Sequence, residues 1–325
     1  MKVLQINKNH YFKGGSDRIY LETSDLLSQH GHQVCHFSTN NVRNLPSKTA
    51  SFFIHAPDFK NLTFLEKIKQ SISYIYSIKS AKELSELITK EKPDIAHLHI
   101  FYGELSLSLL TTLKKHHVPV IMTLHDFKLL CPIHSLYDRN NKICEQCSTG
   151  RYHHAIIKRC SNNKWSLSGM AALESYFRDM FIPYETNINH FIAVSEFTKN
   201  LHLKYRPNLQ GKISKIYNFT TTIETNLVNE KSNYIIYFGR LSREKGLNLL
   251  IRVMSLFKNT PLWIVGEGPE ELNLRCIVHQ LQIKNVYFKG YKQGDELSLL
   301  IKRAKFSVFP SESYESFGLG ITESF

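Results

Sequence analysis

Apolar and polar residues follow one another along this chain in a pattern that predicts strands and helices in regular succession. Short apolar runs, suited to buried strands, begin at positions 2, 33, 93, 119, 190 and 213. Between most of them, apolar residues recur every three or four positions, which indicates helices at 16–30, 81–91, 105–117, 167–181 and 195–204. Ser16 and Ser195 are the expected N-cap residues of the first and last of these helices. Because strand–helix alternation is typical of parallel sheets, the pattern predicts an α/β domain.

The same alternation restarts after a polar stretch at 218–232, which we interpret as a linker. Strands are expected at 234–238, 261–265, 286–288 and 305–309, and helices at 246–257, 270–281 and 294–304. We therefore predict two Rossmann-like, doubly wound domains that face a cleft. The first covers residues 1–220 and the second covers residues 221–325.

One further helix has two interpretations. Leu65, Ile68, Ile72 and Ile75 recur at helical spacing. The lysines around this stripe are Lys60, Lys67, Lys69, Lys79 and Lys82. The stripe could face the core, which we favour, or it could rest on an anionic membrane surface.

Composition and charge narrow the classes of function. The hydrophobic content of 42% is sufficient to fill protein cores, and no apolar run is long enough to span a membrane. The first residues turn polar too soon for a signal peptide, so we expect a cytoplasmic protein, with docking at the inner face of the membrane as an additional expectation. The net charge of +13 favours anionic partners. No nucleic-acid-binding module and no Walker A motif is present, which argues against nucleic-acid binding and NTPase activity.

Two carboxylates, Glu315 and Glu323, stand in and after the run PSESYESFG at 310–318. If a helix begins near Phe317 or Gly318, Glu315 lies in the loop before it and Glu323 about a turn and a half along it. Helix N-termini favour phosphate, and carboxylates accept hydrogen bonds from vicinal hydroxyls. The stretch therefore suits a ligand with a phosphate between two sugars. The alternative is a solvated helix with two surface glutamates.

Two other loops of the second domain carry candidate chemistry. The run GRLSREKG at 239–246 begins with Gly239 and brings Arg240 and Lys245 to the end of a strand, where both cations could bind a diphosphate. The run VGEGP at 265–269 contains Gly266 and Gly268, which permit close approach of the backbone. Each loop alone could be a plain turn.

In the first domain, a glycine pair and one histidine are candidates. Gly14 and Gly15 lie between a strand and a helix, where backbone N–H groups can approach an anion, although a tight turn would explain them equally well. His125 follows the strand at 119–124, and ligands of parallel sheets bind at the carboxyl ends of strands. His97 and His99 share one face of their strand, and we interpret them as packing residues.

Four cysteines, Cys131, Cys144, Cys147 and Cys160, form a C-x12-C-x2-C-x12-C pattern within a loop-rich insert at 131–160. Structural zinc, free thiols and a disulfide remain the alternatives, in that order of preference. Cys35 and Cys276 are expected to be single buried residues.

Taken together, the runs at 239–246, 265–269 and 310–323, with the glycine pair and His125 in the first domain, resemble the family 4 retaining glycosyltransferases. That family has the GT-B fold, and the resemblance covers nearly the whole chain. The chain ends two residues after Glu323, whereas family members usually continue with further strand–helix units. We therefore expect the second domain to be incomplete.

The resemblance implies a role for each candidate residue. Arg240 and Lys245 would hold the donor pyrophosphate, Glu315 the sugar hydroxyls and Glu323 the ribose, while His125 would reach the donor sugar and Gly15 the phosphate. The remaining donor-site positions are Gly14, Gly239, Gly266, Gly268, Phe317 and Gly318.

The implied activity is transfer of a sugar from a nucleotide-sugar to a glycan or a lipid-linked acceptor with retention of anomeric configuration, in the synthesis of a bacterial surface polysaccharide. It implies no catalytic cofactor, with the nucleotide-sugar as co-substrate. The alternative is a truncated protein that binds a nucleotide-sugar without turning it over.

Overall fold

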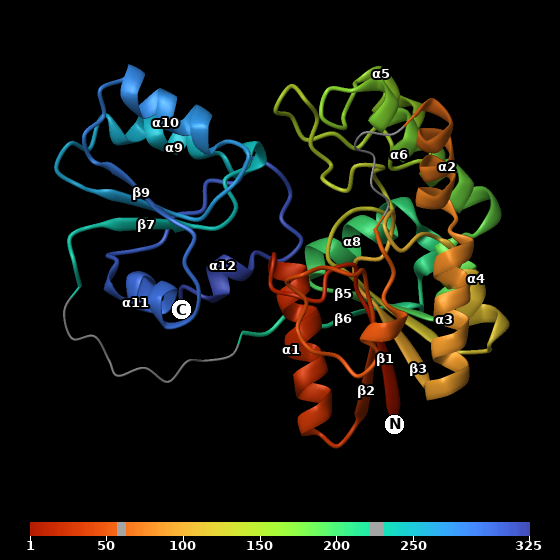
Figure 1. Cartoon of the computed structure of the whole chain (residues 1–325). Helices are drawn as coiled ribbons and strands as arrows, with labels where there is room; N and C mark the ends of the chain where they lie inside the picture. Colours follow the sequence, from red (N-terminus) through yellow and green to blue (C-terminus); the bar gives the residue numbers. More distant parts are fainter. Residues whose placement is uncertain (57–62, 221–230) are drawn as a thin grey trace. The chain divides into compact units, whose positions relative to one another are not determined.

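The computed structural model describes residues 1–56, 63–220 and 231–325 (Figure 1). These residues form two compact units. The first contains Met1–His134 and Glu145–Asn218, and the second contains Ser135–Cys144 and Phe219–Phe325. Most of the predicted linker at 218–232 lies outside the described residues, because 221–230 are not described. The predicted domain boundary after residue 220 falls at the start of that undescribed range. Part of the cysteine-rich insert thus belongs to the second unit.

The first unit is built on a parallel sheet of six strands in the order β2-β1-β3-β4-β5-β6. The strands are β1 (Lys2–Ile6), β2 (Gln33–Phe37), β3 (Ile95–Leu98), β4 (Val120–Leu124), β5 (His190–Ala193) and β6 (Ile213–Lys215). Every neighbouring pair is parallel. This confirms the predicted α/β class.

Helices cover both faces of this sheet. They are α1 (Gly15–Gln29), α2 (Phe64–Ile75), α3 (Ile78–Glu91), α4 (Ser108–Lys115), α5 (His153–Ile157), α6 (Trp165–Phe181), α7 (Tyr184–Asn187) and α8 (Glu196–Tyr205), with 3-10 turns at η1 (Ala50–Phe52) and η2 (Pro207–Leu209). Figure 1 shows α1 on one side of the sheet and α3 and α4 on the other. Such an arrangement is expected when parallel strands are joined by right-handed crossovers.

Helix starts were predicted with mixed success. The Ser195 hydroxyl accepts a hydrogen bond from the Thr198 N–H at 3.1 Å and caps α8, as expected. The prediction for Ser16 was wrong, because the N-cap of α1 is Gly14, two residues earlier, and the helix begins at Gly15. Ser16 therefore lies inside the first turn, where its hydroxyl cannot take the cap position.

The favoured interpretation of α2 as a core-facing helix was also wrong. Leu65 is 76% exposed, Ile68 43% and Ile72 62%, and only Ile75 at the end of the helix is buried. Helical spacing shows which residues share a face, but it does not show whether another element covers that face. Lys60, which was assigned to the basic flank of this helix, lies outside the described residues.

The second unit is smaller and has a parallel sheet in the order β7-β8-β9. Its strands are β7 (Ile235–Phe238), β8 (Leu262–Val265) and β9 (Val286–Gly290), and its helices are α9 (Leu247–Met254), α10 (Glu271–Gln280), α11 (Gly294–Arg303) and α12 (Leu319–Thr322), with a 3-10 turn at η3 (Arg243–Lys245). Ile235 and Tyr237 pack into one core with α9 and α10, whereas Ile236 and Phe238 pack into another with residues of α11. The alternation of side chains along β7 thus builds a core on each face of the sheet.

The strand predicted at 305–309 is reduced to a single parallel bridge between Ser307 and Ile236. Around it, the Ile236 N–H donates to the Phe306 carbonyl at 3.1 Å and the Val308 N–H to the Ile236 carbonyl at 2.8 Å. Pro310 has no N–H with which to continue the pairing along β7. The segment still follows the edge of the sheet, so the loop after it leaves at the same end as the loop after β7.

Helix α12 begins near the predicted position and has four residues. One smaller expectation failed. Cys35 is buried as expected, whereas Cys276 is exposed on α10. None of the helices in the described part of the chain has both the length and the apolar composition needed to cross a membrane.

Candidate active site

Three loops of the second unit meet at the carboxyl end of its sheet. They follow β7, β8 and the segment at 305–309. Backbone hydrogen bonds join them: the Leu241 N–H donates to the Glu267 carbonyl at 3.0 Å, and the Glu312 N–H donates to the Glu244 carbonyl at 2.9 Å. The runs at 239–246, 265–269 and 310–318 therefore form one cluster, as expected for loops at one edge of a parallel sheet.

The contact between these loops explains two of their glycines. Gly246 has φ +67°, and a Cβ there would lie 2.0 Å from the Pro310 carbonyl oxygen. Gly266 has φ +134°, and a Cβ there would lie 2.0 Å from the carbonyl oxygen of Gly239. Both distances are far below van der Waals contact, so any other residue would force the loops apart. The glycines have a packing reason that is independent of a ligand.

Lys245 and Glu315 form an ion pair within this cluster. The Lys245 Nζ lies 2.5 Å from Glu315 Oε1, and the same oxygen accepts a hydrogen bond from the Ser311 hydroxyl at 2.7 Å. The two side chains are half-buried. Because an ion pair that remains in contact with water contributes little net stability, either partner can be transferred to a ligand at low cost.

Arg240 lies on the same loop as Lys245, at 239–246, and is exposed. Within the described residues, its guanidinium makes no hydrogen bond or salt bridge. The Tyr237 hydroxyl donates to the Arg240 carbonyl at 2.9 Å and thereby fixes its backbone rather than its side chain. The loop cluster therefore offers one guanidinium without a described partner and one ammonium in a weak ion pair.

A second set of contacts in this unit was not predicted. The Tyr137 hydroxyl donates to Glu312 Oε2 at 2.8 Å, and Arg243 donates to the carbonyls of Asp138 and Arg139 at 2.8 and 3.0 Å. Burial, reinforced by the hydrogen bond to the carboxylate, raises the pKa of Tyr137. The insert segment 135–144 thus adjoins the signature run at 310–318. The only indication in the sequence was the position of the insert directly after the motif that contains His125.

The other predicted residues of the second unit have ordinary positions near the cluster. Gly318 is the N-cap of α12 with φ +84°, Phe317 precedes it, and Glu323 is the C-cap residue. Glu315 therefore lies before α12, as the spacing predicted, whereas Glu323, which was expected about a turn and a half along the helix, lies at its C-terminal end. Gly239 follows β7, and Gly268 packs against the backbone of Leu241.

In the first unit, Gly14 and Gly15 were expected in the loop before the first helix, but Gly14 is the N-cap of α1 and Gly15 is its first residue. Next to them lies Asp17, which the sequence analysis missed. Its carboxylate is buried and accepts hydrogen bonds from the Asn7 amide at 2.8 Å and the Asn9 amide at 3.2 Å. Burial raises its pKa despite these bonds. A polar residue shortly after a glycine pair, preceded by two asparagines, was the available signal.

His125 lies at the end of β4 and is half-buried. Its Nε2 is 2.8 Å from Nδ1 of His99, and the two rings stack with centroids 5.0 Å apart. Burial lowers the pKa of His125 to about 3, so the imidazole is neutral at neutral pH. His99 is fully buried and bonded to His125, which gives it a polar contact that the packing interpretation did not include.

The four cysteines of the insert are divided between the two units, with Cys144 in the second unit and the other three in the first. Cys131 and Cys147 are buried, and Cys147 packs with Tyr152, while Cys160 lies against the same small core. Within the described residues, no group of three or more His, Cys, Asp or Glu side chains is placed to hold a metal ion. Zinc binding by these cysteines is not tested and stays a prediction.

Comparison with known proteins places these features in a family. The family model described as Glycosyltransferase Family 4 matches residues 13–222, and the model described as Glycosyl transferases group 1 matches residues 218–325. A Klebsiella pneumoniae relative, "Uncharacterized 42.6 kDa protein in cps region", is 23% identical over all of this chain and 82% of that protein.

Solved structures agree in fold. The apo form of the lipopolysaccharide outer core galactosyltransferase WaaB matches with a TM-score of 0.55 at 15% identity, over 100% of this chain and 78% of that one. Anabaena Alr3699/HepE in complex with UDP-glucose matches with a TM-score of 0.58 at 16% identity over the same shares. Both likenesses support the predicted GT-B fold. Because the first family model covers more than half of the sequence, the chain belongs to glycosyltransferase family 4.

Proposed function

We propose that this protein transfers a sugar from a nucleotide-sugar to a glycan or lipid-linked acceptor, with retention of configuration at the anomeric carbon. The observation that carries the proposal is the loop cluster, in which one loop holds the exposed Arg240 together with Lys245, and Lys245 pairs with Glu315 of a second loop. Two cations can bind a diphosphate, and a carboxylate can accept hydrogen bonds from the hydroxyls of the attached sugar.

The chemistry follows from where charge develops. The bond between the anomeric carbon and the diphosphate oxygen breaks, and negative charge builds up on the leaving diphosphate. Arg240 and Lys245 stabilise this charge in the transition state. The acceptor hydroxyl attacks the same face, its oxygen bonds to the anomeric carbon, and its proton passes to the departing diphosphate. No protein nucleophile is required.

The other residues have binding roles in the proposal. Glu315 exchanges its bond with Lys245 for sugar hydroxyls when Lys245 turns to the diphosphate, and Glu323 binds the ribose. From the first unit, His125 binds the donor sugar and Gly15 approaches the phosphate. The glycines of the three loops allow the backbone to come close to the ligand, in addition to their role in loop packing.

The pathway is proposed by analogy. The Klebsiella relative is named for its place in a cps region, and WaaB is described as a lipopolysaccharide galactosyltransferase. These names support the synthesis of a bacterial surface polysaccharide or glycolipid at the cytoplasmic side of the membrane. The competing function is binding of a nucleotide-sugar without transfer.

The test begins with thermal unfolding of the full chain in the presence of UDP-, GDP-, ADP- and dTDP-sugars. A ligand at a hundredfold excess over Kd stabilises the folded state by about 2.7 kcal/mol, so a binding nucleotide-sugar raises the melting temperature. Transfer is then measured with that donor, and the anomeric configuration of the product is read by NMR. An inverted product would refute retention, and binding without any product would favour the competing function.

Arg240→Ala separates catalysis from folding. We expect it to reduce kcat by about a hundredfold, as is typical when a group that stabilises transition-state charge is removed, while the free energy of unfolding changes little. Arg252→Ala is the matched control, because Arg252 is exposed on α9 and its guanidinium bonds only to Asn248 among the described residues. Wild-type turnover in Arg240→Ala would refute the assignment.

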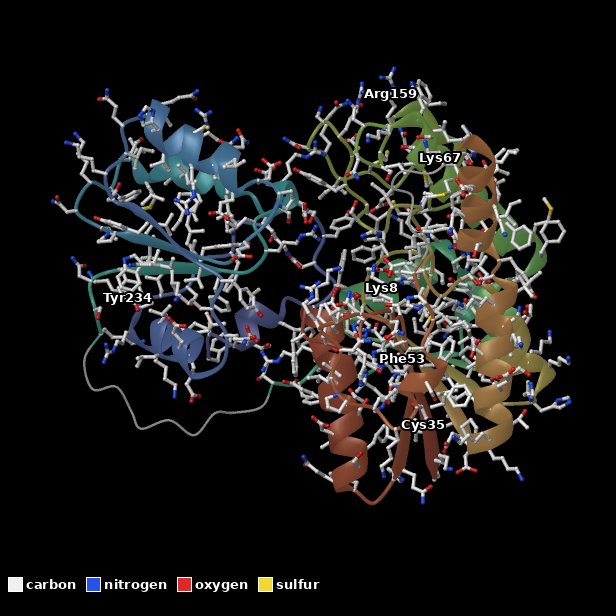
Figure 2. All side chains as sticks on the ribbon, in the orientation of Figure 1. Lys8, Cys35, Phe53, Lys67, Arg159 and Tyr234 are labelled. Atoms are coloured by element: carbon white, nitrogen blue, oxygen red, sulfur yellow. The ribbon has the colours of Figure 1, made fainter. Side chains whose placement is uncertain are left out.

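We further propose that α2 and α6 rest on an anionic membrane surface. The two helices lie beside one another, and α6 adds the exposed Leu173, Met180 and Phe181 to the exposed stripe of α2. Figure 2 shows Lys67 of α2 and Arg159, after α5, at the same end of the first unit. Apolar side chains bordered by cations suit an interface with anionic lipid.

Sedimentation with phospholipid vesicles tests this surface. Ile68→Gln with Ile72→Gln is expected to weaken binding to anionic vesicles, and wild-type binding to purely zwitterionic vesicles should be much weaker because the cations contribute. Leu272→Gln is the control, since Leu272 is 80% exposed on α10 in the other unit. Equal binding by the double variant and the wild type would refute the proposal.

A further inference from the structure

One face of the first sheet carries a row of buried hydrogen-bonding side chains. Gln5 of β1 is in register with His97 of β3, and His99 lies two residues further along the same face. Figure 1 shows β1 and β3 side by side at the centre of the unit. Thr123 of β4 contacts His97 of this row and lies two residues before His125. Buried polar groups in central strands require partners, and these residues provide them for one another.

The hydrogen bonds of this row run in one direction. Gln5 Oε1 can only accept, so His99 Nε2, at 2.9 Å, must carry a proton. A neutral imidazole has a single N–H, which makes His99 Nδ1 an acceptor. His125 Nε2, at 2.8 Å from that atom, must therefore be the donor.

The second branch from Gln5 is consistent with the same amide orientation. The Gln5 amide nitrogen lies 3.3 Å from His97 Nδ1, and His97 Nε2 lies 2.8 Å from the Thr123 hydroxyl. With this orientation, the 2.9 Å contact is an N–H···O bond from His99 to the Gln5 carbonyl oxygen, and the 3.3 Å contact is an N–H···N bond from the Gln5 amide to His97. Burial keeps the pKa of His97 at about 4 and that of His99 well below its usual value, so both rings are neutral and each carries a single proton.

We propose that Gln5 and His99 are positioning residues that hold the His125 imidazole in its Nε2–H tautomer. The other ring nitrogen, Nδ1, is then a hydrogen-bond acceptor. Any ligand hydroxyl that binds His125 through its ring must donate its proton to Nδ1. The inference about the tautomer stands on this row alone, whereas its consequence for a sugar hydroxyl rests on the proposed function.

Nitrogen-15 NMR of the full chain with labelled histidine measures the tautomer directly. The chemical shifts and couplings of the two ring nitrogens show which one carries the proton, and the His125→Asn variant identifies the signals. We expect wild-type His125 to be protonated at Nε2 at pH 7.5. A proton at Nδ1 would mean that the Gln5 amide has the opposite orientation, and it would overturn the proposal.

Two variants test the direction of the row. Gln5→Leu removes the acceptor that orients His99, so His125 should become a mixture of tautomers. Thr123→Val is the matched control, because it removes a buried hydrogen-bonding group from the other branch, and it should leave His125 protonated at Nε2. An equal change in both variants, or in neither, would refute a relay through His99.

If sugar transfer is observed, Gln5→Leu should also lower kcat/KM by about tenfold to a hundredfold, the range for groups that orient metal-bound histidines. Thr123→Val should lower it by no more than about threefold. A tautomer that follows the prediction in a protein without transferase activity would leave the relay intact and refute only the proposed function.

Discussion

Replacing Lys245 by alanine separates a structural ion pair from a ligand-binding cation. Lys245 and Glu315 are 2.5 Å apart but keep 27% and 35% of their side-chain exposure. An ion pair in this environment stabilises the folded state by about 1 kcal/mol or less. The variant should therefore unfold in urea with nearly the wild-type free energy.

The same change should have a larger effect on donor binding. A hydrogen bond to a charged group contributes about 1.5 to 3 kcal/mol, so loss of the ammonium should weaken the binding of the nucleotide-sugar by roughly tenfold to a hundredfold. The assay is isothermal titration calorimetry with the donor that gives the largest thermal shift. Binding and unfolding are measured on the same preparation.

Lys292→Ala is the matched control for this prediction. Lys292 forms an ion pair of 2.6 Å with Glu296 in the same unit, on the loop before α11 and on its first turn. The control should leave donor binding unchanged. If Lys245→Ala lowered the free energy of unfolding by more than about 3 kcal/mol and left donor affinity intact, the pair would be structural and the reasoning would fail.

Three further predictions concern stability, each measured by urea unfolding. Gly266→Ala should lower the free energy of unfolding by about 3 kcal/mol, because its Cβ would collide with the Gly239 carbonyl. Gly290→Ala, at φ +68° in open space, should lower it by only about 1 kcal/mol. Equal losses in the two variants would contradict the loop-packing argument. Lys128→Met should cost about 3 to 5 kcal/mol, because it leaves Glu174 buried without the ammonium at 2.6 Å, and adding Glu174→Leu should restore part of the loss. No loss in the single variant would contradict the reasoning about this buried ion pair. Burial lowers the pKa of His36 and His125 to about 3 and that of His97 to about 4. As the pH falls, the unfolded chain therefore binds protons at these histidines that the folded chain does not bind. The resulting stability is complete above about pH 6.5 and is lost as the pH falls towards 3, by roughly 1.4 kcal/mol per pH unit for each histidine. A flat profile between pH 7 and 5 would show that these rings are hydrated.

Local pattern was enough to predict the order of most strands and helices. Apolar runs bounded by glycine or polar residues became β1, β4 and β8, because a run this short has the length of a strand and is shorter than most helices. The sequence also predicted that Arg240 follows a strand. Because parallel strands bring their carboxyl ends to one edge of the sheet, this position places Arg240 at the edge where ligands bind. The segment at 305–309 was predicted less well because Pro310 limits its pairing.

Contacts between distant residues could not be predicted in this way. The sequence marked Lys245 and Glu315 as candidates, but their ion pair joins positions 70 residues apart. His97 and His99 looked like packing residues because the pattern showed their shared face and not the Gln5 amide of another strand. The exposure of the α2 stripe likewise depends on what covers it.

The sequence by itself determined the elements, their order and the residues carried by each loop, because these depend on neighbours along the chain. Only the tertiary structure decided which of those residues meet, which apolar face stays exposed and which side chains surround His125. Those properties depend on the register of strands and the contact between loops, where a shift of a few ångströms makes or breaks a hydrogen bond.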